Sequence, residues 1–153
     1  AHLAPRLGGD TFFSASYIIL DTQNHSMVVS RAGHEPPLLF NPQRDPQLTP
    51  LSPNGMIIGV DRTNKRFASS IEELDVELVP GDVIFQYTDG LTEAKNQNGE
   101  EFGTSRVENL FIKYGHLNLQ QILDIMFDTV DSFVGDVEQE DDITITTFKY
   151  VGS

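Results

Sequence analysis

A short apolar run between two glycine-containing breaks most constrains how this chain can fold. Residues 83–87 read Val-Ile-Phe-Gln-Tyr, a run rich in the β-branched and aromatic residues that strands favour. Pro80-Gly81 suits the centre of a type II turn, because proline pre-sets one dihedral angle and glycine accepts the positive one. Gly90 ends the run directly after an acid, Asp89. The pattern predicts a buried strand with a carboxylate at its end.

A carboxylate at the end of a buried strand is costly unless a cation or hydrogen bonds meet it. Asp89 therefore has two interpretations, as the cap of a turn or of the next helix, or as a metal ligand. Asp141 and Asp142 precede residues 143–148, where apolar and hydroxyl residues alternate as in a strand with one buried face. If the two strands are antiparallel neighbours, the acids lie at the same end of one sheet. Such oxygen ligands suit Mg²⁺ or Mn²⁺.

Composition restricts the classes of function. The 153 residues suffice for one domain with a core, and a hydrophobic content of 39% is ordinary for a soluble globular protein. A formal net charge of −13 argues against nucleic acid as a partner and against contact of this segment with an anionic membrane. Without cysteine, the chain has no thiolate metal site and no cysteine nucleophile. No apolar run approaches the ~20 residues that span a bilayer, and no signal peptide is recognisable, so we expect a cytoplasmic location.

The order of the predicted elements indicates an α+β fold. The predicted strands span residues 12–20, 27–32, 38–40, 55–60, 71–78, 83–87 and 143–148. Residues 41–53 contain four prolines and are expected to form a surface loop, and residues 61–66 are polar and expected to be exposed. Strands followed by helices and a closing strand, without regular βαβ alternation, predict a mainly antiparallel sheet.

Two helices are predicted between the last two strands. The first is expected to begin in a capping box of Ser105 and Glu108 and to stop at Gly115. The second is expected to be capped by Asn118 and to end at Gly135. The apolar stripe of each helix is expected to belong to the core.

Three stretches resemble motifs of the bacterial PPM-type (protein phosphatase 2C-like) serine/threonine phosphatases. They are residues 32–39 (Ala-Gly-His-Glu-Pro-Pro-Leu-Leu), 87–94 (Tyr-Thr-Asp-Gly-Leu-Thr-Glu-Ala) and 141–144 (Asp-Asp-Ile-Thr). Their order and spacing resemble the stage II sporulation protein E-like branch, which includes the sigma-factor regulator phosphatases. The resemblance covers nearly all of residues 11–150. It implies an antiparallel β-sandwich flanked by helices, with a site for two divalent cations at one edge.

The resemblance also implies the chemistry and the residues that perform it. Two Mg²⁺ or Mn²⁺ ions would activate a water that hydrolyses phosphoserine or phosphothreonine, so that no residue acts as a nucleophile. By position, Asp89 matches the metal-binding acid of the Thr-Asp-Gly motif, and Asp141 matches the first acid of the Asp-Asn/Asp-Ile-Thr motif. The secondary candidates are Gly90, Glu93, Asp142 and His34.

The secondary candidates also have structural interpretations. Asp142 is expected to cap the closing strand or to hold a ligating water, and Glu93 could reach the site through water. His34 could act as a general acid or a ligand, but an imidazole that orders the loop before Pro36-Pro37 is the favoured interpretation.

The chain departs from the family pattern in the upstream part. The family's metal site also uses an aspartate and an aspartate-glycine pair from the first half of the domain, and no such pair lies at a fitting distance before Asp89. Gly8-Gly9-Asp10 imitates one upstream motif, but it precedes His34 by only 24 positions (34 − 10) and is expected to be a turn. We therefore expect residues 1–153 to be a single partial domain that lacks its N-terminal portion, with residues 1–10 as the tail of a preceding element.

The predicted function is that of a metal-dependent protein serine/threonine phosphatase. The resemblance alone implies its substrate, a small phosphorylated regulator such as an anti-sigma factor antagonist, and an upstream sensor or receiver domain in the parent chain. The fragment by itself is expected to bind metal weakly and to be inactive, since its two carboxylates lack their partners. Two alternatives remain: an interaction module of the same fold with a decayed metal site, and an acidic α+β domain without metal chemistry.

Overall fold

The computed structural model describes residues 11–61 and 65–152, and these divide into two compact units. Of the described residues, the first unit comprises 11–36, 51–61, 65–79 and Gly152, and the second comprises Pro37–Pro50 and Pro80–Val151. The predicted tail at residues 1–10, with its turn at Gly8-Gly9-Asp10, lies outside the described residues. No helix within residues 11–61 and 65–152 is long and apolar enough to cross a membrane.

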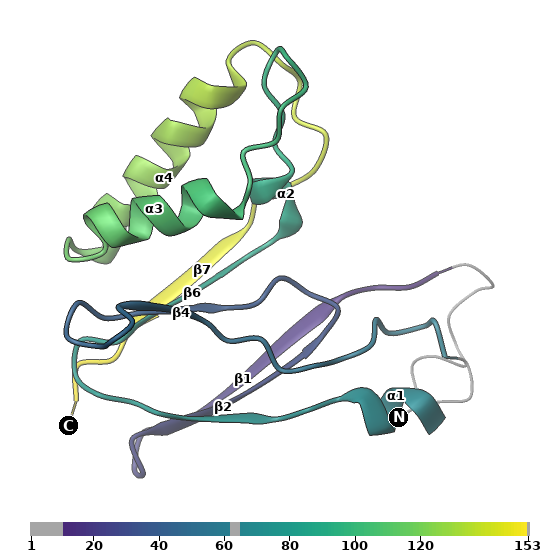
Figure 1. The fold of residues 1–153 in the computed structure, drawn as a ribbon, viewed down its shortest axis with the longest axis vertical. Helices are drawn as coiled ribbons and strands as arrows, with labels where there is room; N and C mark the ends of the chain where they lie inside the picture. The colour runs from purple at the N-terminus through teal and green to yellow at the C-terminus, as the bar shows by residue number, and fades with distance from the viewer. Residues whose placement is uncertain (1–10, 62–64, 153) are drawn as a thin grey trace. The chain divides into compact units, whose positions relative to one another are not determined.

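The first unit is built on a three-stranded antiparallel sheet in the order β1-β2-β5 (Figure 1). Its elements are β1 (Ala15–Asp21), β2 (Ser26–Ala32), α1 (Lys65–Ser70) and β5 (Leu74–Glu77). The strands predicted at residues 12–20 and 27–32 form the antiparallel β1–β2 pair, whose register runs from Ala15 opposite Ala32 to Asp21 opposite Ser26. Met27 and Val29 of β2 are fully buried, as the alternating pattern requires.

Two strand predictions in the first unit were wrong, because one segment forms no strand and the other forms a shorter strand than predicted. Residues 55–60 do not form a strand, because only Ile58 pairs, in an isolated bridge with Phe13. The strand predicted at residues 71–78 begins only at Leu74, since the amide of Glu72 donates to the carbonyl of Asn54 in a loop. The polar stretch predicted at residues 61–66 leads into α1, which was not predicted.

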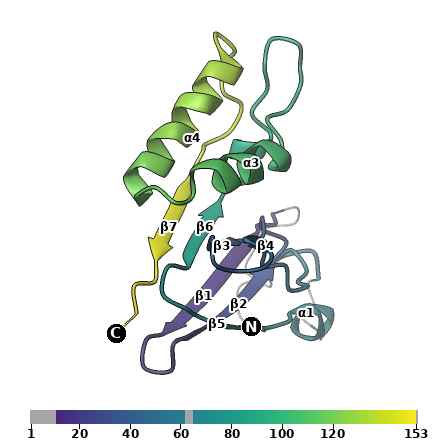
Figure 2. The same ribbon diagram turned by 60° about the vertical axis from the view of Figure 1, so that its left-hand side comes forward.

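The second unit contains a four-stranded antiparallel sheet in the order β4-β3-β6-β7. Its strands are β3 (Leu38–Phe40), β4 (Leu48–Pro50), β6 (Val83–Tyr87) and β7 (Ile145–Lys149). Its helices are α2 (Asp89–Thr92), α3 (Thr104–Tyr114) and α4 (Leu119–Val134). Figure 2 shows α3 and α4 beside β6 and β7 in this unit. Two antiparallel sheets with helices confirm the predicted α+β class.

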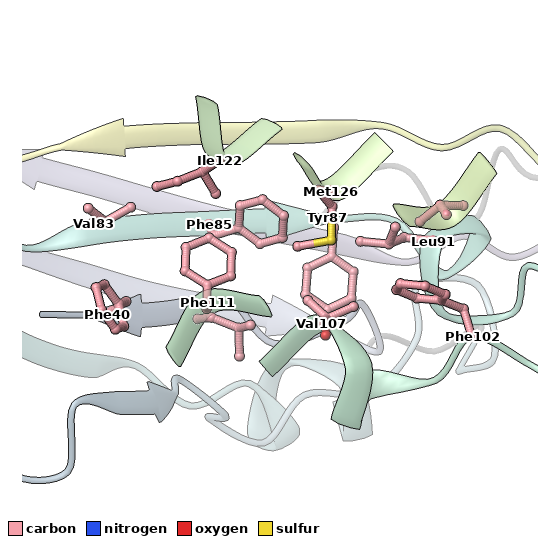
Figure 3. Close-up of a cluster of buried hydrophobic side chains, with 12 residues drawn as sticks. Phe40, Val83, Phe85, Tyr87, Leu91, Phe102, Val107, Phe111, Ile122 and Met126 are labelled. Atoms are coloured by element: carbon pink, nitrogen blue, oxygen red, sulfur yellow. The ribbon is translucent and has the colours of Figure 1, made fainter. Parts of the chain in front are cut away.

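One aromatic-rich core joins the helices to the sheet in the second unit (Figure 3). Phe85 of β6 meets Phe111 of α3 edge to face, with ring centroids 4.5 Å apart. The helices contribute the residues predicted from their apolar stripes, namely Val107, Phe111, Ile122, Met126 and Val130. Burying each such side chain contributes about 1.5–3 kcal/mol, so this core accounts for much of the unit's stability.

The two long helices begin differently. Asn118 caps α4 as predicted, because its side chain accepts from the amide of Gln121 while the Gln121 side chain accepts from the amide of Asn118. The capping box predicted at Ser105 was wrong. Gly103 precedes α3 with a φ of 77° and donates its amide to the carbonyl of Thr92, so the helix already begins at Thr104.

A buried carboxylate anchors the β3–β4 connection to the start of β6. Asp82 is fully buried and receives two hydrogen bonds from the guanidinium of Arg44, at 2.8 and 2.6 Å, and one from Asn41 at 2.9 Å. Charge-assisted bonds of this bidentate kind compensate for the burial of the charge. The predicted surface loop at residues 41–53 is therefore more ordered than expected, and it contains β4.

Candidate metal-binding edge

The ends of β6 and β7 bring the two predicted acidic segments together in the second unit. The strands pair antiparallel up to Tyr87 opposite Ile145. Beyond that pair, the amide of Thr88 donates to the carbonyl of Thr144 at 3.1 Å. The sheet thus places the chain at Asp89 next to the chain at Asp141, which is the neighbour relation on which the predicted site depended.

The Thr88 hydroxyl forms the tightest connection between the two segments. It donates to the carbonyl of Asp142 at 2.9 Å and accepts from the amide of Thr144 at 2.9 Å. The side chain therefore continues the sheet where the regular ladder ends. Thr88, directly before Asp89, therefore ties its own segment to the segment that carries Asp141 and Asp142.

Gly90 allows a close approach of the two backbones. A Cβ atom at this position would lie 2.6 Å from the carbonyl oxygen of Asp142 and 3.3 Å from that of Asp141. Side chains do not occupy such positions, so only glycine lets α2 pass against the loop before β7. Gly90, a secondary candidate from the sequence, thus has a clear packing role.

Asp89 is the first residue of α2, and it is exposed. The residue that precedes the helix is Thr88, which makes no side-chain capping bond to it. The carbonyl of Asp89 accepts from the amide of Glu93 at 2.8 Å and from the Thr92 hydroxyl at 3.1 Å. These hydrogen bonds fix the backbone of Asp89, while the residue itself is exposed.

Asp141 and Asp142 are also exposed. The carboxylate of Asp141 accepts from the amide of Asp142 at 2.7 Å, and its carbonyl accepts from the side chain of Gln139. Asp142 contacts Thr88 through its main-chain carbonyl. Glu93 is exposed at the C-cap of α2.

His34 lies in the first unit, and its contacts are local. Its Nδ1 is 2.8 Å from the Ser14 hydroxyl, and its carbonyl accepts from the guanidinium of Arg31 at 2.6 Å. Arg31 also donates to the carbonyl of Pro53 at 2.9 Å. These bonds are those of a residue that orders the loop after β2.

A cavity of about 210 Å³ adjoins the edge within the second unit. Gly90 and Asp141 line one side of it, and the C-terminal turns of α4 line another. Two residues of its lining form an ion pair, in which the ammonium of Lys95 bonds the carboxylate of Glu140 at 2.7 Å, and this contact raises the pKa of Lys95. No local pattern in the sequence predicts this cavity, because its walls come from three segments far apart in the chain.

The edge offers a divalent cation only part of the donor set that it needs. Exposed carboxylates at Asp89 and Asp141 have the oxygen chemistry of Mg²⁺ and Mn²⁺ sites. Within residues 11–61 and 65–152, however, no three His, Cys, Asp or Glu side chains are grouped so that they could hold a metal ion. The described residues can therefore contribute carboxylates to a cation, but they do not form a complete metal centre.

The chain has the fold of a PP2C-type phosphatase domain. It is similar to the SiaA-PP2C domain of Pseudomonas aeruginosa with a TM-score of 0.75 and 21% identity, over 90% of this chain and 51% of that one. It is also similar to the phosphatase domain of the cell fate determinant SpoIIE from Bacillus subtilis, Mn presoaked, with a TM-score of 0.65 and 19% identity, over 92% and 57% of the two chains.

Residues 1–151 match the family model of stage II sporulation protein E (SpoIIE), and the chain belongs to this family. It is 28% identical to protein IcfG of Synechocystis sp. (strain ATCC 27184 / PCC 6803 / Kazusa) over 146 residues, which cover 94% of this chain and 22% of that protein. It is 29% identical to the phosphoserine phosphatase RsbU of Bacillus subtilis (strain 168) over 89 residues, which cover 58% of this chain and 24% of that protein.

The family and fold predicted from the three motifs are confirmed. The chain nevertheless spans less than a quarter of the length of these two relatives and little more than half of the two solved phosphatase domains.

Proposed function

We propose that this chain is part of a PP2C-type serine/threonine phosphatase domain, in which Asp89 and Asp141 are ligands of divalent cations. The observation that carries the proposal is the connection through Thr88, which holds the two acid-bearing segments side by side. The match of the family model over residues 1–151 supports a single partial domain that includes both units.

The residues of this chain would act by position and charge. Asp89 and Asp141 would hold Mg²⁺ or Mn²⁺, Thr88 and Gly90 would fix the backbone beneath them, and other ligands would come from beyond the described residues. Such a pair of cations activates a water and neutralises the phosphoryl oxygens of the substrate. A protein nucleophile is not required, which agrees with a chain that has no cysteine.

We further propose that the substrate is a phosphorylated regulatory protein, such as an anti-sigma factor antagonist. The family of the chain and its similarity to a phosphoserine phosphatase support this class of substrate. An upstream sensor or receiver domain and a cytoplasmic location belong to the same proposal, because such a regulator acts on transcription inside the cell. The net charge of −13 disfavours nucleic acid as the partner.

The test is phosphate release by the full-length protein from a phosphoserine peptide with and without Mn²⁺. Asp89→Asn and Asp141→Asn should each lower kcat/KM by about 100-fold or more, since each substitution removes a charged ligand. Asp136→Asn is the matched control, because Asp136 is an exposed acid that precedes the same loop.

Two outcomes would contradict the proposal. If both variants kept the activity of the wild type, Asp89 and Asp141 would not be ligands. If the full-length wild type released no phosphate with Mn²⁺, the interaction module with a decayed metal site would be the better account.

A further inference from the structure

The cavity beside Asp141 is enclosed by parts of the second unit that meet only in the fold. Its walls are the chain that follows α2, the last turns of α4 and the loop before β7. At about 210 Å³ it is smaller than the roughly 300–1,000 Å³ typical of small-molecule and cofactor pockets. Its volume suits a single side chain of a larger partner.

The lining of the cavity combines apolar side chains with exposed carboxylates. Val130, which is 1% exposed, and Val134 contribute to the apolar part, together with Ala94 and Ile143. Besides Asp141, which the proposed function assigns to a cation, four exposed acids line it, namely Glu93, Asp131, Glu138 and Glu140. Lys95 is the one basic residue in the lining, and its ammonium is bonded to Glu140.

This combination defines the chemistry of the occupant. An anionic or phosphorylated side chain would face like charges from these carboxylates and is disfavoured there. A lysine or arginine matches both kinds of lining, because its aliphatic stem can contact apolar side chains while its cationic head contacts carboxylates. Charge complementarity of this kind contributes chiefly to specificity.

Fixed backbone contacts shape the walls before any ligand binds. Gly135, with a φ of 64°, ends α4 and donates its amide to the carbonyl of Asp131 at 2.9 Å. In the segment that follows α2, which forms another wall, Lys95 pairs with Glu101 in an isolated antiparallel bridge. The two walls thus have defined conformations, and the Lys95–Glu140 contact joins the second of them to the loop before β7.

We propose that this cavity is a specificity subsite that binds a lysine or arginine side chain of the phosphoprotein substrate. The inference rests on the proposed function, since it takes the neighbouring edge as the phosphatase centre. Gly90 and Asp141 belong both to that edge and to the lining of the cavity. The basic residue therefore lies within a few positions of the phosphorylated serine or threonine in the substrate sequence.

The first experiment scans a basic residue through a phosphoserine peptide. The full-length protein with Mn²⁺ is assayed on peptides that carry lysine, norleucine or glutamate at each of the positions flanking the phosphoserine. At one position, lysine should raise kcat/KM by about tenfold over norleucine, which has a similar aliphatic stem without the charge. Glutamate should be the poorest of the three at that position.

The second experiment reverses the charge on the cavity wall. Asp131→Lys should reduce the lysine-to-norleucine ratio of kcat/KM to about one, since a cation then lines the cavity in place of an acid. Asp128→Lys is the matched control, because Asp128 is an exposed acid of the same helix and does not line the cavity. That variant should retain the ratio of the wild type.

The outcomes separate this inference from the proposed function. An enzyme that hydrolyses the phosphopeptides but shows no preference for lysine at any position overturns the subsite and leaves the phosphatase intact. A preference that Asp131→Lys and Asp128→Lys reduce equally also overturns it, because the effect would then reflect overall charge. A protein that hydrolyses none of the peptides overturns the proposed function and the subsite with it.

Discussion

Thr88 shows how a single side chain can hold two distant segments of the chain together. Its hydroxyl uses its hydrogen as a donor to Asp142 and a lone pair as an acceptor from Thr144, so both polar functions are directed at the neighbouring segment. A carboxylate on a fixed backbone binds a cation more tightly, because less conformational entropy is lost on binding. We infer that Thr88 is a positioning residue for Asp141.

Replacement of Thr88 by valine keeps the shape of the side chain and removes both hydrogen bonds. Thr88→Val should lower the free energy of unfolding by about 1–3 kcal/mol, because the Thr144 amide and the Asp142 carbonyl lose their partner. Denaturant unfolding of the full-length protein gives this value. Thr146→Val is the control on β7, since Thr146 is exposed, and it should change stability by no more than about 0.5 kcal/mol.

A positioning role predicts more than a loss of stability. Thr88→Ser retains the hydroxyl and should restore both stability and the Mn²⁺ dependence of phosphate release, whereas Thr88→Val should require a higher Mn²⁺ concentration for half-maximal activity. If Thr88→Val and Thr146→Val proved equally stable and equally responsive to Mn²⁺, Thr88 would have no such role.

Some residues of the edge could be recognised from the sequence, and others could not. Asp89 and Asp141 stand out because each is an acid at the boundary of a patterned strand. The requirement for glycine at position 90 arises from a carbonyl more than fifty residues further along the chain, so no local pattern encodes it. Asp82 was missed for the same reason, since its partners Arg44 and Asn41 belong to a distant connection.

At the scale of elements, the turn between β1 and β2 is organised around one carboxylate. Asp21 accepts hydrogen bonds from the amides of Gln23 and Asn24 at 2.9 and 3.0 Å, and from the side chain of Asn24 at 2.8 Å. These bonds favour the charged form, and the one from the Asn24 side chain contributes most to lowering the pKa of Asp21 below its ordinary 3.8.

The lowered pKa gives the hairpin a defined dependence on pH. A carboxyl whose pKa is depressed by folding stabilises the folded state above its unfolded pKa, and this contribution is lost as pH falls below about 3.8 through the folded value. Asn24→Ala should raise the pKa of Asp21 towards 3.8 and reduce this acid-dependent loss. Carbon-detected NMR titration of the side-chain carboxyl measures the change.

The neighbouring turn residue supplies the control for this measurement. Thr22 is exposed, so Thr22→Ala should leave the pKa of Asp21 where it is in the wild type. An Asp21 pKa that is the same in Asn24→Ala and in the wild type would show that the amides of the turn alone stabilise the carboxylate.

Elements with strong internal patterning were predictable, and those defined by distant pairing were not. Regular spacing of apolar residues located α3 and α4, and the Asn118 cap was correct because both of its partners lie within one turn of the chain. Residues 55–60 have the composition of a strand but find only one pairing partner. Conversely, β4 lies in a proline-rich stretch and forms because Leu39 pairs with Thr49.

At the scale of the whole molecule, the main constraint is how much of a phosphatase domain this chain contains. It corresponds to 51% and 57% of two solved phosphatase domains, and its described residues lack a group of three potential metal ligands. A cation bound by two exposed carboxylates keeps most of its water, so little of the energy of a complete site is available. The binding of metal should therefore depend on residues outside the described ranges 11–61 and 65–152.

The last prediction concerns residues 1–153 expressed as a separate polypeptide. We expect Mn²⁺ to bind it with a dissociation constant of about 10⁻⁴–10⁻³ M or weaker, and phosphate release from a phosphoserine peptide to be close to background. Titration calorimetry and a phosphate-release assay measure the two quantities, with the full-length protein in parallel. The comparison requires that the far-ultraviolet circular dichroism of the polypeptide show folded helices and strands. Robust Mn²⁺-dependent turnover by the folded polypeptide would contradict the prediction, because residues 1–153 would then contain a complete site.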